Sequence, residues 1–182
     1  MTNLDEQPVL TDGTLTLRPW RVDDADAVYR ACQDPDIQRW TQVPVPYTRA
    51  DAEGFVTEFA PAAWRGGTGV VFAVVDGSDS LLASIGVVDL DRPNRSCEIG
   101  YWVAPDARRR GVASGATALL SAWVGEAFDV DRVELYTAPE NVASQGVAAR
   151  AGFRRDGEAE HASRGAPVLM LRHIYGAPTA EG

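Results

Sequence analysis

The sequence predicts a mixed α+β fold, in which helices flank a central, mostly antiparallel sheet of seven strands. Strand-like and helix-like apolar patterns follow one another along the 182 residues in the order β-α-α-β-β-β-α-β-α-β-β. Three consecutive strands joined by tight turns favour antiparallel pairing, whereas the later strand–helix–strand unit favours a parallel pair. The sheet is therefore expected to be mixed rather than a doubly wound parallel one.

The first strand and the first helix are predicted near the N-terminus. Residues 14–18 alternate polar and apolar side chains, which is typical of a strand. Asp23 or Asp24 is expected to cap a helix that runs to about residue 32, because a short acidic side chain accepts hydrogen bonds from the free N–H groups of a first turn. Asp34-Pro35 is expected to stop this helix, because the residue before a proline is disfavoured in helical conformation.

An irregular loop and a second helix are expected next. Residues 39–47 are aromatic and rich in proline, which favours a loop. Thr48 is a good cap for a helix over residues 49–65. Pro61 is expected to end this helix early or to kink it, because proline donates no backbone hydrogen bond and its ring clashes with the preceding turn.

Three strands follow in close succession. Residues 70–75 and 81–90 are apolar runs separated by Asp76-Gly77-Ser78-Asp79, a sequence typical of a hairpin turn. A second turn at residues 93–94 leads into a strand over residues 97–103.

The C-terminal part then alternates between helix and strand before a last hairpin. We expect a helix over residues 110–128, a strand over 132–137, a short helix from Asn141 to Gly152, and strands from Phe153 and over 168–175.

The composition indicates one domain over residues 1–182, with flexible ends at about 1–12 and 176–182. A hydrophobic content of 45% suffices for a core, and no run of 18 apolar residues predicts a membrane span. The acidic N-terminus fits neither a secretory nor a transit peptide, so we expect a cytoplasmic protein. Cys32 and Cys97 match no metal or redox spacing, and no metal site is expected.

The net charge of −9 argues against nucleic acid as a partner, because binding requires a basic face that neutralises phosphates. An acidic surface would attract a cationic partner such as an amine or a basic peptide. Solubility alone is the other explanation of the charge.

Residues 108–114, Arg-Arg-Arg-Gly-Val-Ala-Ser, stand out against this acidic background. They lie between a predicted strand and a predicted helix, where unpaired N–H groups and roughly half a positive charge gather at the helix start. Gly111 would let a phosphate approach the backbone, because glycine has no Cβ. The segment is therefore a candidate site for a phosphate-bearing molecule, although an ordinary helix start with solvated arginines is the alternative.

Two common nucleotide motifs do not match this segment. A P-loop requires a lysine, and the 17 basic residues of this chain are all arginine. A Rossmann motif requires Gly-x-Gly-x-x-Gly, whereas here alanines stand at positions 113 and 116.

The arginine–glycine segment, together with three other blocks of sequence, resembles the GNAT N-acetyltransferase superfamily, and most of all the branch that acetylates the N-terminal serine of ribosomal proteins. The resemblance covers residues 14–175 and implies a GNAT fold with two splayed parallel strands in the middle of the sheet. Four blocks carry it: Leu15-Thr-Leu-Arg-Pro-Trp with Asp23-Asp-Ala-Asp-Ala-Val-Tyr, Glu98-Ile-Gly-Tyr-Trp-Val, Arg108-Arg-Arg-Gly-Val-Ala, and Asn141-Val-Ala-Ser with Gly152-Phe153.

The resemblance implies that acetyl-CoA is the co-substrate and that it lies between the strands at 97–103 and 132–137. A bulge near Trp102-Val103 would aim the Val103 N–H at the thioester oxygen, as an oxyanion donor. The implied acetyl-CoA-binding residues are Val103, Arg108, Arg109, Arg110, Gly111, Val112, Ala113, Ser114, Asn141 and Ser144.

The chain departs from the family pattern at one catalytic position. Many GNAT enzymes carry a tyrosine seven residues after the helix asparagine, and that tyrosine protonates the departing thiolate. Here the position is Ala148, and the resemblance implies Ser144 in its place. A thiol with a pKa of about 8.5 leaves fairly well near neutrality, so a hydroxyl hydrogen bond can suffice. A first-turn helix serine bonded to backbone is the alternative.

Glu98 is the candidate general base, because it is a carboxylate in an otherwise apolar strand that leads to the expected site. An ion pair with an arginine such as Arg95 is the alternative.

Trp40 and Tyr47 would form the wall of the acceptor pocket, unless they only anchor their loop. His161 follows Glu158 and Glu160 near the last hairpin, which is another edge of the site in relatives, although a solvated polar turn is expected there.

The expected activity is transfer of an acetyl group from acetyl-CoA to a primary amine, either a protein or peptide N-terminus or a small molecule. The attack is direct and passes through a tetrahedral intermediate. A non-catalytic acyl-CoA-binding module, or a longer donor such as succinyl-CoA, is the alternative. A homodimer is a further expectation from the resemblance.

Overall fold

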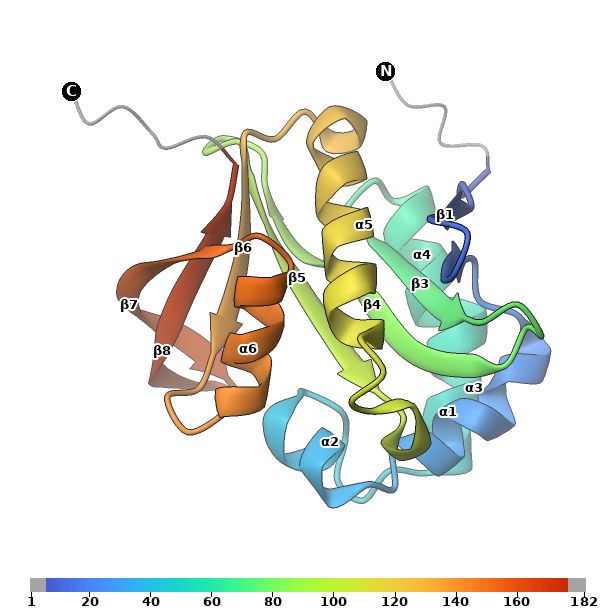
Figure 1. Ribbon diagram of the computed structural model, residues 1–182. Coiled ribbons are helices and arrows are strands. Elements are labelled where there is room, and N and C mark those ends of the chain that lie inside the picture. The colour runs from blue at the N-terminus through green and yellow to red at the C-terminus, as the bar shows by residue number, and fades with distance from the viewer. Residues whose placement is uncertain (1–5, 177–182) are drawn as a thin grey trace.

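An eight-stranded sheet runs through the middle of the structure, in the order β1-β2-β3-β4-β5-β6-β8-β7 (Figure 1). The structure is a computed structural model and describes residues 6–176. β5 and β6 pair in parallel, and every other neighbouring pair is antiparallel. The strands are β1 (Leu10–Thr11), β2 (Thr16–Arg18), β3 (Val70–Val75), β4 (Leu81–Asp91), β5 (Ser96–Val103), β6 (Arg132–Thr137), β7 (Arg154–Ser163) and β8 (Ala166–Tyr175).

Helices cover both faces of this sheet. In Figure 1, α5 and α6 lie in front of it and α4 lies behind it. Within residues 6–176, no helix is both long and apolar enough to cross a membrane. The helices are α1 (Ala25–Ala31), α2 (Pro35–Trp40), α3 (Arg49–Gly54), α4 (Ala60–Arg65), α5 (Val112–Phe128) and α6 (Val142–Arg150).

The fold class and the mixed sheet are confirmed, with one strand more than the seven predicted. The extra strand is β1, whose Leu10 and Thr11 pair with Leu17 and Thr16 of β2. These two residues lie in the N-terminal segment for which flexibility was expected. Residues 1–5 and 177–182, the outer parts of the two expected flexible ends, lie outside the described residues.

The first helix, α1, ends at Ala31, before Asp34 and Pro35, as expected, but these two residues also begin a helix that was not predicted, α2. The Asp34 backbone is extended, and its carboxylate accepts hydrogen bonds from the N–H groups of Asp36 and Ile37. Pro35 occupies the first helical position, where an N–H would have no helical partner in any case. The irregular loop therefore begins after Trp40 and not at residue 39.

The predicted helix over residues 49–65 is present, and Pro61 does not end it. Between α3 and α4, Phe55–Phe59 form a π-helical turn. The N–H of Ala60 donates to the carbonyl of Phe55, five residues earlier. Pro61 follows this wider turn and has no N–H with which to continue the helical hydrogen bonds. Because the wider turn already changes the hydrogen-bond spacing there, the helix continues past Pro61 to Arg65.

A cluster of four aromatic rings joins α4, α5 and β3. Every residue of β3 is buried, since helices cover it on both sides. The Trp123 ring of α5 packs against Trp64 of α4 at 6.4 Å, Phe72 of β3 at 6.0 Å and Phe128 at 5.9 Å between centroids. These contacts hold α5, and with it the loop that precedes α5, against the sheet.

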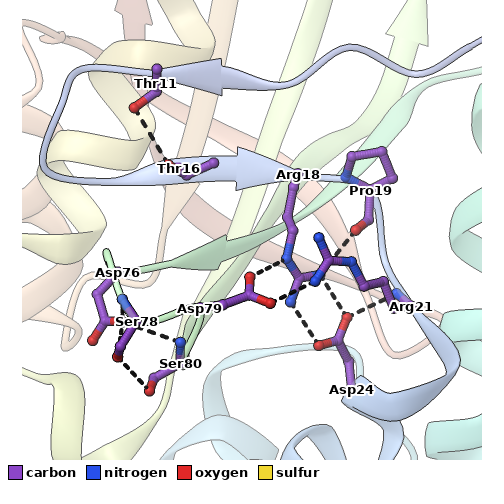
Figure 2. A network of polar contacts seen from close by, with 10 residues as sticks. All are labelled: Thr11, Thr16, Arg18, Pro19, Arg21, Asp24, Asp76, Ser78, Asp79 and Ser80. Atoms are coloured by element: carbon purple, nitrogen blue, oxygen red, sulfur yellow. Dashed lines mark hydrogen bonds and ion pairs between the residues drawn. The ribbon is translucent and has the colours of Figure 1, made fainter.

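A buried arginine ties the start of the sheet to the first helix (Figure 2). Arg18, only 4% exposed, donates two hydrogen bonds to Asp24, at 2.8 and 2.9 Å. Its Nε donates to Asp79 at 2.7 Å, in the turn between β3 and β4. Asp24 also accepts the N–H of Arg21. A bidentate pair inside the protein interacts strongly, because little water screens it.

Asp24→Asn is expected to lower the free energy of unfolding by about 3–5 kcal/mol, because it removes the buried carboxylate that pairs with the buried Arg18 through two hydrogen bonds and leaves only the Asp79 carboxylate, half exposed, as its partner. Urea denaturation at neutral pH measures the change. The matched control is Asp26→Asn, two residues along, whose exposed ion pair with Arg49 should contribute less than about 1 kcal/mol. Equal losses in the two variants would show that the Arg18 pair is not a structural link.

Candidate active site

The two parallel strands of the sheet separate part-way along their length. β5 and β6 pair at three positions only, the last being Glu98 with Glu134. Beyond that point β5 continues to Val103, still paired with β4, and β6 continues to Thr137, still paired with β8. In Figure 1 the two strands diverge toward their C-terminal ends. The expected splayed parallel pair in the middle of the sheet is confirmed.

The inner edge of β5 carries an unpaired N–H at Val103. In an antiparallel ladder, successive residues direct their N–H groups to opposite sides of the strand. The N–H of Ala104 donates to Leu82 O of β4, so the N–H of Val103 points the other way, to where β6 has departed. No bulge is needed for this orientation. The expected bulge near Trp102-Val103 is wrong, because the β4–β5 register is regular there and shifts instead between Val87 and Asp89.

The loop before α5 has the geometry of an anion-binding turn. Gly111 has a φ of +76°, and a Cβ placed on it would meet no atom within 4 Å. The first backbone bond of α5 runs from the N–H of Gly115 to the Gly111 carbonyl. The N–H groups of Val112, Ala113 and Ser114 therefore have no preceding helical turn to pair with. They form an open cluster of donors at the N-terminal end of a 17-residue helix.

The three arginines of this loop have different surroundings. Arg108 donates to the Asp34 carboxylate at 2.5 Å and approaches Asp36 at 3.5 Å, which links the loop to the start of α2. Arg109 and Arg110 are exposed. Arg109 also has a positive φ, of +59°, so the loop turns sharply through two left-handed residues. Arg108 is thus committed to holding the loop, while the side chains of the other two lie at the surface.

Helix α6 faces the other side of the separation. Asn141 caps it by accepting the Ser144 N–H at 3.1 Å, so the short helix begins at Asn141, as expected. The Ser144 hydroxyl lies 2.7 Å from the hydroxyl of Tyr101, on β5. Ala148, at the position where many family members carry tyrosine, is fully buried in the core.

Glu98 lies on the opposite face of the sheet, where it meets His161. Successive side chains of a strand point to opposite faces of the sheet. Glu98 and its partner Glu134 therefore lie on one face, while Tyr101 and Val103 lie on the other, which α6 covers. Glu98 Oε2 lies 2.8 Å from His161 Nε2 on β7, and the Glu98 side chain is 19% exposed. Burial raises the pKa of the Glu98 carboxyl, although the hydrogen bond with His161 opposes this.

A pocket of about 340 Å³ surrounds this pair, and half of its lining residues are acidic. Glu134 in its wall accepts hydrogen bonds from Arg132 and Tyr136. The lining residues are Asp89, Asp91, Ser96, Cys97, Glu98, Glu134, Tyr136, Glu160, His161 and Ala162. The pocket therefore presents negative charge beside a carboxyl group whose pKa is raised.

Two assignments made from the sequence are corrected on this face. Arg95 does not pair with Glu98, because its guanidinium binds Asp129 and Asp131. His161 does not belong to a solvated turn, because it lies on β7 with its ring 4.5 Å from the Tyr136 ring. The alternation of side chains along residues 154–163 could have placed His161 on a strand. Nothing in the sequence near His161 indicates contact with Glu98, which is 63 residues away.

The loop after α2 lies beside the turn between β7 and β8. The Arg164 guanidinium donates to the carbonyls of Thr41 and Val43, and its N–H donates to the Gln42 side chain. Trp40, partly exposed, lies beneath the guanidinium of its neighbour Arg39. Tyr47 is 6% exposed and lies in the core, beside the buried Cys32. Tyr47 thus anchors the loop, which was the alternative to a pocket wall.

Comparison with known proteins identifies the family. Residues 14–154 match the acetyltransferase (GNAT) domain. The chain belongs to the GNAT acetyltransferase family. It is therefore an acyltransferase, as the resemblance of its motifs implied.

Curated relatives of this GNAT chain come from Bacillus. YdaF of Bacillus subtilis (strain 168), which carries a provisional name as a ribosomal N-acetyltransferase, is 35% identical over 80 residues. That match spans only 44% of each chain. YoaA of the same organism, named as an uncharacterized N-acetyltransferase, is 24% identical over 82% of this chain and 85% of its own length.

Solved structures share the fold along nearly the whole chain. RimJ from Mycobacterium smegmatis, in complex with a CoA disulfide, has a TM-score of 0.78 at 24% identity, covering 97% of this chain and 88% of its own. RimL, a ribosomal L7/L12 α-N-protein acetyltransferase in complex with coenzyme A, has a TM-score of 0.80 at 17% identity, covering 92% and 97%.

Proposed function

We propose that this protein transfers an acetyl group from acetyl-CoA to a primary amine, with an acceptor that is a peptide N-terminus or a small amine. The observation that carries the proposal is the separation of β5 from β6 between an anion-binding loop on one side and an acidic pocket on the other. The CoA-bound relatives and the family support acetyl-CoA as the donor.

The donor would be held mainly by backbone groups. Its pyrophosphate would accept hydrogen bonds from the N–H groups of residues 109–114, at the positive end of the α5 dipole. Arg109 and Arg110 are exposed and add positive charge to this cradle. Arg108 would act through Asp34, by fixing the shape of the loop. Asn141 caps α6 beside the separated strands, where a pantetheine arm would pass.

The thioester carbonyl would be polarised by the N–H of Val103. This donor belongs to a strand fixed on its other edge by β4, so it requires no rearrangement as the oxyanion forms. The amine nitrogen attacks the carbonyl carbon and forms the C–N bond, after which the C–S bond breaks and its electron pair leaves with sulfur.

The acceptor would enter from the acidic pocket on the other face. Carboxylates there attract an ammonium group, and Glu98 would take the proton that the amine nitrogen gives up. A raised pKa makes Glu98 a stronger base than an ordinary carboxylate. An α-amine, with a pKa near 8, is already partly neutral at neutral pH and asks less of the base than a lysine amine near 10.4. Trp40, beside the β7–β8 turn, is a candidate wall for this acceptor.

The protein should release free CoA thiol from acetyl-CoA only when a suitable amine is present. A thiol-reactive dye, with a panel of peptides bearing free N-termini and of small amines, measures the release. The same peptides with acetylated N-termini are the control. Tight acetyl-CoA binding without thiol release for any amine would favour a non-catalytic binding module instead.

Gly111→Val should reduce acetyl-CoA affinity by at least about tenfold, because a β-branched residue does not hold a φ of +76° and its Cβ would lie where the phosphate approaches. Isothermal titration calorimetry measures the affinity. Gly13→Val is the matched control, because Gly13 has a φ of +89° and open space around it but lies in the β1–β2 turn. Near-normal binding by the Gly111 variant would contradict the phosphate cradle.

Glu98→Gln should lower kcat on the order of 10²-fold or more and remove the acidic limb of the pH–rate profile. In the wild type that limb should lie above pH 4.3, the ordinary glutamate value, because the pKa of Glu98 is raised and the base form is lost as pH falls through it. Glu160→Gln, an exposed carboxylate of the same pocket, should keep the limb. A Glu98 variant with the wild-type limb would show that another group is the base.

A further inference from the structure

We infer that Tyr101 is a positioning residue for the leaving group, which keeps Ser144 supplied with the proton that the departing CoA thiolate takes up. The inference rests on the proposed acetyl transfer and adds to it a residue to which the family resemblance gave no role. It is drawn from the hydroxyl pair between β5 and α6.

The pair joins two elements that are far apart in sequence. Tyr101 Oη lies 2.7 Å from Ser144 Oγ, across 43 residues of chain. Tyr101 is on β5 past the last pair with β6, two residues before Val103 and on the same face as Val103. Ser144 is fixed in turn, because its N–H is bound to the Asn141 side chain. Both hydroxyls therefore lie at the separated strands, beside the proposed oxyanion donor.

A serine hydroxyl by itself is a poor source of a proton. An alkyl hydroxyl is a far weaker acid than a phenol, whose ordinary pKa is about 10, close to the value of about 8.5 for a thiol. A serine that gives up its proton must regain one in the same event. The phenol of Tyr101 is within hydrogen-bond distance and can supply it.

The surroundings keep the phenol in the donating form. Burial raises the pKa of Tyr101, although the hydrogen bond with Ser144 opposes this. A phenol whose pKa lies above its ordinary value remains protonated throughout the neutral range, so it enters each cycle as a donor. At the position where many family members carry a helix tyrosine, this chain has Ala148, which is buried. In this chain the phenol that approaches α6 thus comes from Tyr101 on β5 instead.

The step balances with groups already named. When the tetrahedral intermediate collapses, the C–S bond breaks and its electron pair goes to sulfur. Sulfur takes the proton of Ser144 Oγ, and Ser144 takes the proton of Tyr101. The phenolate regains a proton from solvent after the thiol leaves, and the proton that the amine lost leaves Glu98 for solvent.

The test compares two donors that differ in their leaving atom. Tyr101→Phe should lower kcat with acetyl-CoA on the order of 10²-fold, with acetyl-CoA affinity by calorimetry unchanged. With the selenoester of the same coenzyme, the defect should shrink to a few-fold, because a selenol is a stronger acid than a thiol and leaves without a proton. Tyr29→Phe, on α1, is the control and should match the wild type with both donors.

The combined variant and Ser144→Ala complete the experiment. Ser144→Ala should show the same dependence on the leaving atom, and Tyr101→Phe with Ser144→Ala should be no slower than the slower single variant, because the two hydroxyls act as one unit. Equal defects with the thioester and the selenoester, or additive defects in the double variant, would overturn the inference. If Tyr101→Phe does not fold, the thioester and selenoester donors are compared with Ser144→Ala alone, and equal defects with the two donors overturn the inference. Turnover of acetyl-CoA by the wild type shows whether the proposed acetyl transfer itself holds, independently of the role of Tyr101.

Discussion

The early end of the β5–β6 pairing is the constraint on which the rest of the site depends. Three residue pairs join these strands, and each strand is then held only by its outer neighbour, β5 by β4 and β6 by β8. Because those outer ladders are intact, the strands can separate without losing their own conformation. Separation leaves backbone donors such as the Val103 N–H without a partner, and unpaired donors in a protein interior are costly unless something binds them. The fold therefore carries a preformed edge that a ligand carbonyl can satisfy.

Opposite charges lie on the two sides of this separation. On one side, the exposed Arg109 and Arg110 and the first turn of α5 present positive charge. On the other, a pocket lined by carboxylates surrounds Glu98. A polyphosphate and an ammonium group are thus each favoured on one side and disfavoured on the other. The separation of charge explains why three consecutive arginines lie in one loop of a chain whose net charge is −9. One of the three, Arg108, binds Asp34 and so fixes the loop to the start of α2.

What the sequence predicted well was local, and what it missed was contact between distant segments. Apolar periodicity located seven of the eight strands and the long helix, and the residue types of 108–114 located the glycine loop before α5. The partner of Glu98 was not predictable in this way, because His161 reaches it through the pairing of β7, β8, β6 and β5. Likewise nothing near Tyr101 indicates Ser144, since alternation assigns a residue to a face but not to a neighbour on another element. The start of α2 was missed for a different reason, because an Asp-Pro pair suits both the end of one helix and the beginning of the next.

The register shift in β4 shows how a single residue decides the character of the acceptor pocket. From Ala83 to Val87, the partners in β4 and β5 follow one regular register, in which Val87 faces Ile99. Continued without a shift, that register would place Asp89 opposite Cys97, on the buried face that α5 and α6 cover. The irregularity between Val87 and Asp89 instead places Asp89 opposite Glu98 and Asp91 opposite Ser96, while Val88 is left 59% exposed. One inserted residue exchanges the two faces of a strand, so the same sequence with a regular strand would bury carboxylates beneath helices, at a high cost. The exposed Val88 is the smaller cost that the fold accepts, and the result is a wall of negative charge beside the proposed base.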